Sequence, residues 1–155
     1  MDKKISNQEA FSNKVVWITG ASAGIGEEMA VAFARSGSKL VLSARNSEQL
    51  ERVEKRCYEA GADREGVLVI PLDVVDLDAM PGAVDKVMEA YSRIDLLINN
   101  AGVGVRDFCT EVQLDLYRTA LEVNLMGPIA LTKQVLPIMI KQGSGHIAGT
   151  SSVAG

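Results

Sequence analysis

Apolar residues in this chain come in short runs separated by longer stretches of mixed polarity. The runs are rich in Val, Ile and Leu and have the length of buried strands, whereas the stretches between them repeat apolar residues every three to four positions, as amphipathic helices do. The pattern predicts strands at about 14–19, 39–44, 67–72, 95–99 and 145–151. It predicts helices at about 24–36, 47–61, 77–92 and 111–141.

Strands and helices therefore alternate, and the strands are apolar throughout. This combination is typical of a parallel sheet covered by helices on both faces. Right-handed crossovers give the strand order 3-2-1-4-5, so we predict an α/β, doubly wound parallel sheet with a Rossmann-like fold. Residues 1–13 are mostly polar and are expected to be a flexible leader, and 14–155 to form the domain.

Each of the first three predicted helices has one apolar face that should lie against the sheet. These faces consist of Ile25, Met29, Ala30, Phe33 and Ala34; of Leu50, Val53 and Cys57; and of Met80, Val84, Val87 and Met88. The many charged residues of the second helix are expected to form its solvated outer face.

Composition and charge narrow the classes of function. With 155 residues, 47% hydrophobic content and a net charge of −4, the chain reads as one globular domain, and the negative charge disfavours nucleic acid and anionic membranes as partners. Cys57 and Cys109 are widely spaced and His146 is the only histidine, so we expect neither a disulfide framework nor a metal site.

The same residues bear on location. Two isolated cysteines suggest a reducing compartment, and no uninterrupted apolar run reaches the ~18 residues of a membrane span. We therefore expect a cytoplasmic protein without a transmembrane segment, and we leave peripheral association with a membrane open.

The glycine-rich stretch Thr19–Gly26 joins the first strand to the first helix and has the spacing G-x-x-x-G-x-G. Bare backbone N–H groups and the positive end of a helix dipole meet in such a turn, which makes it a receptor for phosphate. No lysine follows, which excludes an ATP or GTP P-loop. The alternative is a tight turn without a ligand. We predict that the cofactor-binding residues here are Gly20, Ser22, Ala23, Gly24, Ile25 and Gly26.

The glycines have separate roles in this prediction. Gly20 permits the tight turn, Gly24 the close approach of a ligand, and Gly26 the close packing of helix on strand. The cofactor itself is indicated by the end of the second strand, where an acidic residue would bind the ribose of NAD(H). Arg45 and Asn46 stand there instead, and a guanidinium can hold a 2′-phosphate. We therefore favour NADP(H) over NAD(H); the alternative is a surface arginine at a helix start.

Further candidates follow the next strands. Asp73 and Val74 come after the third strand and are placed to meet an adenine ring. The alternative is that Asp73 is a turn or cap residue, for which Asp76 is the better cap. The loop after the fourth strand reaches the same cleft, and its candidate cofactor-binding residues are Asn100, Ala101 and Gly102.

Asn124 lies inside the longest predicted helix, four residues before Pro128. Proline has no N–H, so the carbonyl of Asn124 loses its helical partner and can accept a bond from water or an ammonium group. The alternative is that Gly127 and Pro128 only bend the helix around the core.

Together these motifs resemble those of the short-chain dehydrogenase/reductase family. The resemblance rests on Thr19–Gly26, Asp73, the Asn-Asn-Ala-Gly stretch 99–102, Asn124 and the Ser-Ser-Val-Ala-Gly stretch 151–155, and it covers residues 14–155. It implies hydride transfer between a nicotinamide and a small carbonyl or alcohol substrate, lipophilic ones included. More loosely, Ser43-Ala44-Arg45 with Leu50–Val53 is similar to the microsomal retinoid and steroid branch.

The resemblance also implies roles for particular residues. Ser152 matches the catalytic serine that holds the substrate oxygen, with Ser151 as second choice, and Asn124 matches the asparagine of a proton relay. In the family a Tyr-x-x-x-Lys motif supplies the acid/base tyrosine and the lysine that lowers its pKa. Complete family members are expected to be homo-oligomers.

The Tyr-x-x-x-Lys motif is missing from these 155 residues. Tyr58, Tyr91 and Tyr117 are followed four residues later by Ala62, Asp95 and Leu121. We therefore expect a truncated chain that turns over no substrate alone, and whose fifth strand is an open edge that makes it poorly soluble or associating. The alternative is a non-catalytic dinucleotide-binding or interaction protein.

Overall fold

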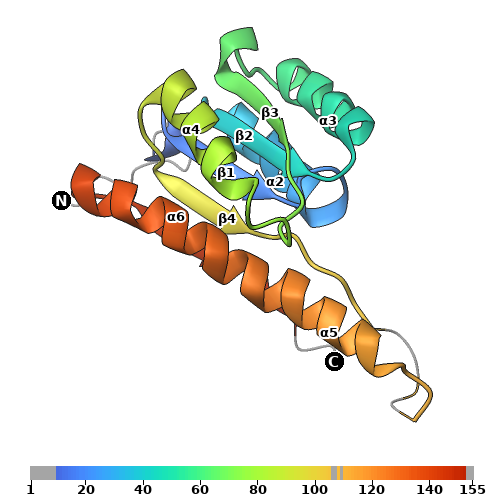
Figure 1. Ribbon diagram of the computed structural model, residues 1–155. Coiled ribbons are helices and arrows are strands. Elements are labelled where there is room, and N and C mark those ends of the chain that lie inside the picture. Colours follow the sequence, from blue (N-terminus) through green and yellow to red (C-terminus); the bar gives the residue numbers. More distant parts are fainter. Residues whose placement is uncertain (1–9, 106–107, 109, 153–155) are drawn as a thin grey trace, which may run out of the picture.

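The computed structural model describes residues 10–105, 108 and 110–152, and its centre is one parallel sheet (Figure 1). The strand order is β3-β2-β1-β4-β5, as predicted. In the middle of the sheet Trp17 is in register with Val41 on one side and Leu97 on the other. The strands are β1 (Val15–Thr19), β2 (Lys39–Ala44), β3 (Val67–Pro71), β4 (Leu96–Asn99) and β5 (His146–Gly149).

Helices connect the strands close to the predicted positions. They are α2 (Gly24–Arg35), α3 (Ser47–Glu59), the 3₁₀ turn η1 (Arg64–Gly66), α4 (Met80–Tyr91), α5 (Leu114–Leu121), the π-helical segment η2 (Glu122–Met126) and α6 (Gly127–Gln142). Two starts are later than predicted, at Met80 instead of 77 and at Leu114 instead of 111. Before α4, the Asp76 carboxylate accepts the N–H of Ala79 at 3.2 Å, so the chain turns before it becomes helical.

The two faces of the sheet carry two separate cores, because side chains alternate along each strand. Trp17, Val41 and Leu97 lie on the face covered by α4 and α6. Ile18 and Leu42 lie on the opposite face with α2 and α3. The chain thus has the three layers of a doubly wound fold.

The predicted inner face of α2 was partly wrong. Ile25 is 64% exposed, and Met29 and Phe33 are only half-buried. The buried apolar positions of this helix are Ala30, Val31 and Ala34. Small side chains let the helix axis approach the sheet closely, so the bulkiest residues are not the innermost ones. The faces predicted for α3 and α4 are confirmed, except that Met88 is half-buried.

The charged residues of α3 do not all form a solvated outer face. Arg52 and Arg56 both bind Glu27, which is buried in the first turn of α2. The prediction missed this because Glu27 lies on another helix, 25 residues before Arg52 in the sequence.

The end of the predicted leader lies against the domain. The rings of Phe11 and Phe33 meet edge to face with centroids 5.1 Å apart. The Ser38 hydroxyl donates to the Phe11 carbonyl at 2.9 Å, and the Asn13 N–H donates to Gly37 at 2.8 Å. Residues 1–9 lie outside the described part of the chain.

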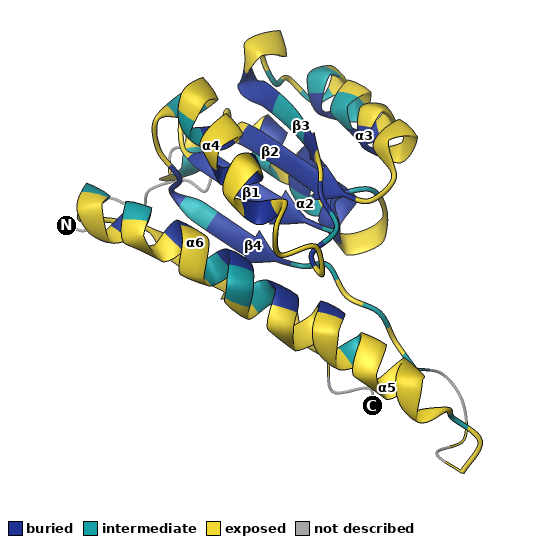
Figure 2. Ribbon diagram, viewed as in Figure 1, coloured by how far each residue is buried: buried dark blue, intermediate teal, exposed yellow. Residues whose placement is uncertain are grey.

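The stretch Leu114–Gln142 is one continuous helical rod that extends beyond the sheet and exposes much of its length (Figure 2). By length and composition alone it could cross a membrane, with 22% of its most apolar window buried. No such segment was expected, because the expectation required uninterrupted apolar residues, whereas mean hydropathy averages over polar ones. Core helices pass the same test, and Leu131, Val135 and Met139 do contact the sheet.

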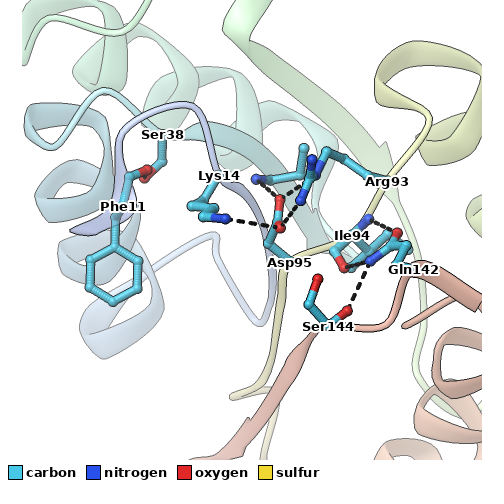
Figure 3. Close-up of polar contacts among 9 residues, drawn as sticks. Phe11, Lys14, Ser38, Arg93, Ile94, Asp95, Gln142 and Ser144 are labelled. Atoms are coloured by element: carbon cyan, nitrogen blue, oxygen red, sulfur yellow. Dashed lines mark hydrogen bonds and ion pairs between the residues drawn. The ribbon is translucent and has the colours of Figure 1, made fainter. Parts of the chain in front are cut away.

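Polar contacts connect neighbouring elements at the amino ends of the strands (Figure 3). Asp95, only 6% exposed, accepts the N–H of Val15 at 2.9 Å and binds both Arg93 and Lys14. Figure 3 also shows Gln142, which bonds the N–H and carbonyl of Ile94 at 2.9 Å each. The Asp95 contact to Val15 joins the starts of β1 and β4, and Gln142 joins the end of α6 to the start of β4. Both lie at the amino ends of the strands, away from the candidate site.

Candidate functional site

A cleft of about 610 Å³ opens at the carboxyl ends of β1, β2 and β4. It lies where the strand order reverses, which is where ligands bind in doubly wound folds. All but two of the predicted cofactor-binding residues line it, the exceptions being Gly24 and Gly26. Its predicted lining residues are Gly20, Ser22, Ala23, Ile25, Arg45, Asn46, Asp73, Val74, Asn100, Ala101 and Gly102.

The glycines of the turn are required by its geometry. Gly20 has φ +65°, and a Cβ there would lie 2.7 Å from the Cα of Ala101. A Cβ on Gly26 would lie 2.2 Å from the carbonyl oxygen of Gly20, so only glycine fits against the turn. Gly24 has φ +57° and faces open space, with no described atom within 4 Å of a Cβ there. Gly26 thus allows a close approach, but to the turn residue Gly20 and the Asn100 side chain, whereas the prediction was packing of the helix on the strand.

The N-terminus of α2 opens into the cleft without a side-chain cap. Its N-cap is Ala23, which has an extended backbone and no side chain that could accept a hydrogen bond. The first amides of a helix have no partner within the helix and carry the positive end of its dipole. This arrangement can hold a phosphate group.

A hydrogen-bond network ties the glycine turn to the loop after β4. The Thr19 hydroxyl donates to the carbonyl of Ile98 at 3.4 Å and accepts the N–H groups of Asn100 at 3.0 Å and Ala101 at 3.1 Å. The Asn100 amide donates to the carbonyls of Thr19 and Gly20, and the Thr150 hydroxyl donates to Asn100 Oδ1 at 3.0 Å. Asn100 therefore holds the walls of the cleft together.

Arg45 and Asn46 lie at the rim, directly after β2. The Asn46 side chain caps α3 by accepting the N–H of Gln49 at 3.0 Å. Arg45 is exposed, and within the described residues no hydrogen bond or ion pair engages its guanidinium. Its charge is therefore available to an anion in the cleft.

Asp73 and Val74 form the neighbouring wall. Asp73 Oδ1 accepts the N–H of Val75 at 3.2 Å, so this residue does shape a turn while it also lines the cleft. Gly127, at the start of α6, lies against the same loop, because a Cβ there would be 2.6 Å from the carbonyl oxygen of Val74.

Asn124 lies in the π-helical segment, immediately before the helix reaches Pro128. Here the Gly127 N–H donates to the carbonyl of Glu122, five residues back instead of four, so regular helical bonding is interrupted one residue before Pro128. The Asn124 side chain does not line the cleft. It clamps the backbone of Val103, with Oδ1 accepting its N–H at 2.8 Å and Nδ2 donating to its carbonyl at 2.9 Å.

Ser151 and Ser152 follow β5 and are exposed. Neither lines the cleft, and residues 153–155 of the predicted motif lie outside the described part of the chain. Asn124 and Ser152 thus lie on different elements. Asn124 is in η2 and supports Val103, which lines the cleft, whereas Ser152 follows β5, the last strand at one edge of the sheet.

Several residues contribute to the site although the sequence-based prediction assigned them no role in it. Thr19, Thr150 and Gln49 line or brace the cleft, and Gly127 lets α6 approach it. A hydroxyl at the last position of a buried strand is a signal that could have identified Thr19. The position of Gln49, one helical turn after the cap Asn46, could have identified that residue.

Comparison with known proteins agrees with this geometry. Residues 14–155 match the family described as short chain dehydrogenase. The chain is 45% identical over 146 residues to dehydrogenase/reductase SDR family member 7 of Homo sapiens, covering 94% of this chain and 43% of the relative. It spans about half the length of the curated relatives it matches.

Solved structures show the same fold. A metagenomic short-chain oxidoreductase (SDR) in complex with NADP has 34% identity and a TM-score of 0.85, and the match covers 94% of this chain and 65% of that one. A short chain dehydrogenase/reductase SDR from Burkholderia phymatum in complex with NAD has 35% identity and a TM-score of 0.85, with 93% and 50% covered. Because sequence motifs, strand order and cleft agree, the chain belongs to the short-chain dehydrogenase/reductase family of oxidoreductases.

Proposed function

We propose that this chain is the cofactor-binding part of an NADP(H)-dependent oxidoreductase that transfers hydride between the nicotinamide and a carbonyl or alcohol carbon. The observation that carries the choice of cofactor is Arg45, a guanidinium at the rim of the cleft that no described residue engages. The similar structures hold NADP in one case and NAD in another, so the family leaves the cofactor open. A positive charge directly after β2 favours a 2′-phosphate over a ribose diol.

The proposed cofactor contacts follow from the walls of the cleft. The uncapped amides at the start of α2 would hold the pyrophosphate, with Gly24 leaving room for its approach. Asp73 and Val74 would contact the adenine, and the loop Asn100–Gly102 would line the part of the cleft between β1 and β4. When bound, the nicotinamide supplies the hydride chemistry.

The proposed catalytic residues are Ser152, which would hold the substrate oxygen, and Asn124, whose carbonyl would accept a bond in a proton relay. No tyrosine in these 155 residues has a lysine four residues later. Burial raises the pKa of Tyr58, which also bonds Glu54, and of Tyr91, each to about 12. Neither is suited to proton transfer at neutral pH, so we propose that the 155 residues alone turn over no substrate.

The proposed partner is a small carbonyl or alcohol substrate, lipophilic ones included, with a homo-oligomer for the complete protein. The proposed location is the cytoplasm, with peripheral contact to a membrane left open. A second candidate function, cofactor binding without chemistry, is favoured by the missing Tyr-x-x-x-Lys motif.

The cofactor proposal is tested by titrating NADPH and NADH against the protein, using the fluorescence of the reduced nicotinamide. Arg45→Ala would remove the charge-assisted contact to the 2′-phosphate. It should therefore weaken NADPH binding by about tenfold or more and leave NADH binding unchanged. Arg35→Ala, an exposed arginine in the last turn of α2, is the control and should change neither affinity. An unchanged ratio of the two affinities in Arg45→Ala would refute the 2′-phosphate role.

A further inference from the structure

Glu27 is a buried carboxylate in the first turn of α2, directly after the glycine-rich turn, and it is 6% exposed. Arg52 of α3 binds it through two parallel contacts, Nη1 to Oε1 and Nη2 to Oε2, each 2.7 Å long. Arg56, one turn further along α3, binds the same carboxylate and also Glu28 at 2.9 Å. A forked guanidinium contact of this kind fixes orientation as well as charge.

The two arginines differ in their contact with the glycine-rich turn. Nη2 of Arg52 also donates to the carbonyl oxygen of Ser22 at 3.2 Å, whereas Arg56 forms no hydrogen bond with a turn residue among the described ones. Ser22 lines the cleft, and the next residue is Ala23, the N-cap of α2. Arg52 itself is absent from the cleft lining.

An ion pair that only joins two helices would not need this contact. The two helices already meet through apolar residues, among them Ala30, Ala34, Leu50 and Val53, in a shared buried cluster. Gly20 and Gly24, on either side of Ser22, have positive φ and no side chain to hold the turn in place. The contact to the Ser22 carbonyl therefore restrains the turn at the residue directly before the N-cap of α2.

We propose that Arg52 is a positioning residue for cofactor binding, which holds the glycine-rich turn in its binding conformation by bonding the Ser22 carbonyl while Glu27 anchors its guanidinium. The inference rests on the proposed dinucleotide binding at this turn. It differs from the proposed role of Arg45, because the turn would serve the part of the ligand that NADPH and NADH share.

Arg52→Ala and Arg56→Ala form a matched pair for the test. Each removes one positive charge from α3 and one partner from Glu27, and each leaves the other arginine to neutralise that carboxylate, so both variants should fold. The affinities for NADPH and NADH are measured by fluorescence titration, and the thermal midpoint of each variant is measured alongside.

Arg52→Ala should weaken NADPH and NADH binding alike, by about tenfold, since a charge-assisted hydrogen bond that orders the turn is lost. Arg56→Ala should bind both dinucleotides as the unchanged protein does, even where its thermal midpoint falls as far. Equal affinities in the two variants would overturn the inference, because affinity would then follow charge or stability.

This test still works if the 2′-phosphate proposal is wrong. NADH has no 2′-phosphate, so its affinity for the two variants measures the effect of the turn independently of Arg45. If neither dinucleotide binds even to the unchanged protein, the proposed function fails and the role of Arg52 in cofactor binding fails with it. Amide hydrogen exchange of residues 22–26 then decides separately whether Arg52 holds the turn in place. Faster exchange in Arg52→Ala than in Arg56→Ala would show that Arg52 holds the turn in place, and equal exchange would show that it does not.

Discussion

Asp95 and Glu27 are the two buried carboxylates among the described residues, and their surroundings keep both ionised. The hydrogen bond from Arg52 lowers the pKa of Glu27, helped by Arg56 and opposed by burial. Burial raises the pKa of Asp95, but the hydrogen bonds from Arg93 and from the Val15 N–H outweigh it, so the net shift is downward. Each charge is stabilised by partners that do not exist in the unfolded chain.

These lowered pKa values predict loss of stability in acid. A group whose folded pKa lies below its unfolded pKa contributes its full stabilisation above the unfolded value and loses it as pH falls through the folded value. The free energy of unfolding should therefore be level near neutral pH and should fall from the ordinary carboxyl values, 4.5 for Glu27 and 3.8 for Asp95, downwards.

Urea unfolding between pH 7 and pH 3 measures this dependence. Asp95→Asn should unfold more easily at neutral pH and should show a smaller fall in acid, since the titrating group is gone. The exposed Glu89→Gln serves as control and should keep the original pH dependence. A fall in acid that is equally steep in Asp95→Asn would contradict the assignment.

At the scale of whole elements, the end of α6 is joined to β4 and β5 by one side chain. Gln142 accepts the N–H of Ile94 and donates to the carbonyls of Ile94, at 2.9 Å, and Ser144, at 3.1 Å. Ile94 is fully buried, so its backbone groups have no water to replace these bonds. The helix, the strand start and the turn into β5 therefore depend on the same residue.

Replacing Gln142 should loosen this junction. Gln142→Ala should lower the free energy of unfolding by about 1–3 kcal/mol, because buried backbone groups lose their partners. Lys141→Ala is the matched control, an exposed neighbour without a hydrogen bond or ion pair in the described residues. It should change the free energy of unfolding by less than about 0.5 kcal/mol. Chemical denaturation compares the two, and equal effects would show that Gln142 has no such role.

At the scale of the whole molecule, the rod of α5, η2 and α6 exposes a stripe of apolar side chains. The residues repeat every three to four positions or multiples of that spacing and lie along one side of the helix; they are Leu121, Leu125, Ile129, Leu136 and Ile140. Figure 2 shows this exposed length, which no other element within the described residues covers. A stripe of this extent is typical of surfaces that bind another molecule.

We expect copies of the chain to associate through this stripe. Ile140 is 70% exposed, and burying such a side chain contributes about 1.5–3 kcal/mol. Ile140→Glu should therefore raise the dissociation constant of the self-associated form by about tenfold or more. Sedimentation velocity at several concentrations measures this. The control is Lys55→Glu, an exposed residue of α3 on the opposite face of the sheet, which should leave association unchanged. A chain that is monomeric at every concentration would refute the expectation.

Much of the fold was predictable because it depends on local patterns. The apolar runs, the glycine spacing and the handedness of crossovers predicted the strands, the helices and the order 3-2-1-4-5. The cleft was predictable for the same reason, since carboxyl ends of parallel strands meet at one edge. Its lining residues Gly20, Arg45, Asp73 and Asn100 each follow directly after a strand or lie within two residues of one.

The tertiary structure alone decided which residues hold these elements together. Glu27 pairs with Arg52 across two helices, Thr19 bonds the loop at Asn100, and Asn124 clamps Val103. Periodicity along the chain shows which side of an element is apolar, but it does not identify an interaction partner that lies on another element. The sequence by itself therefore determined the architecture and the place of the site, whereas the approach of distant segments decided what braces it, because that depends on distances between elements.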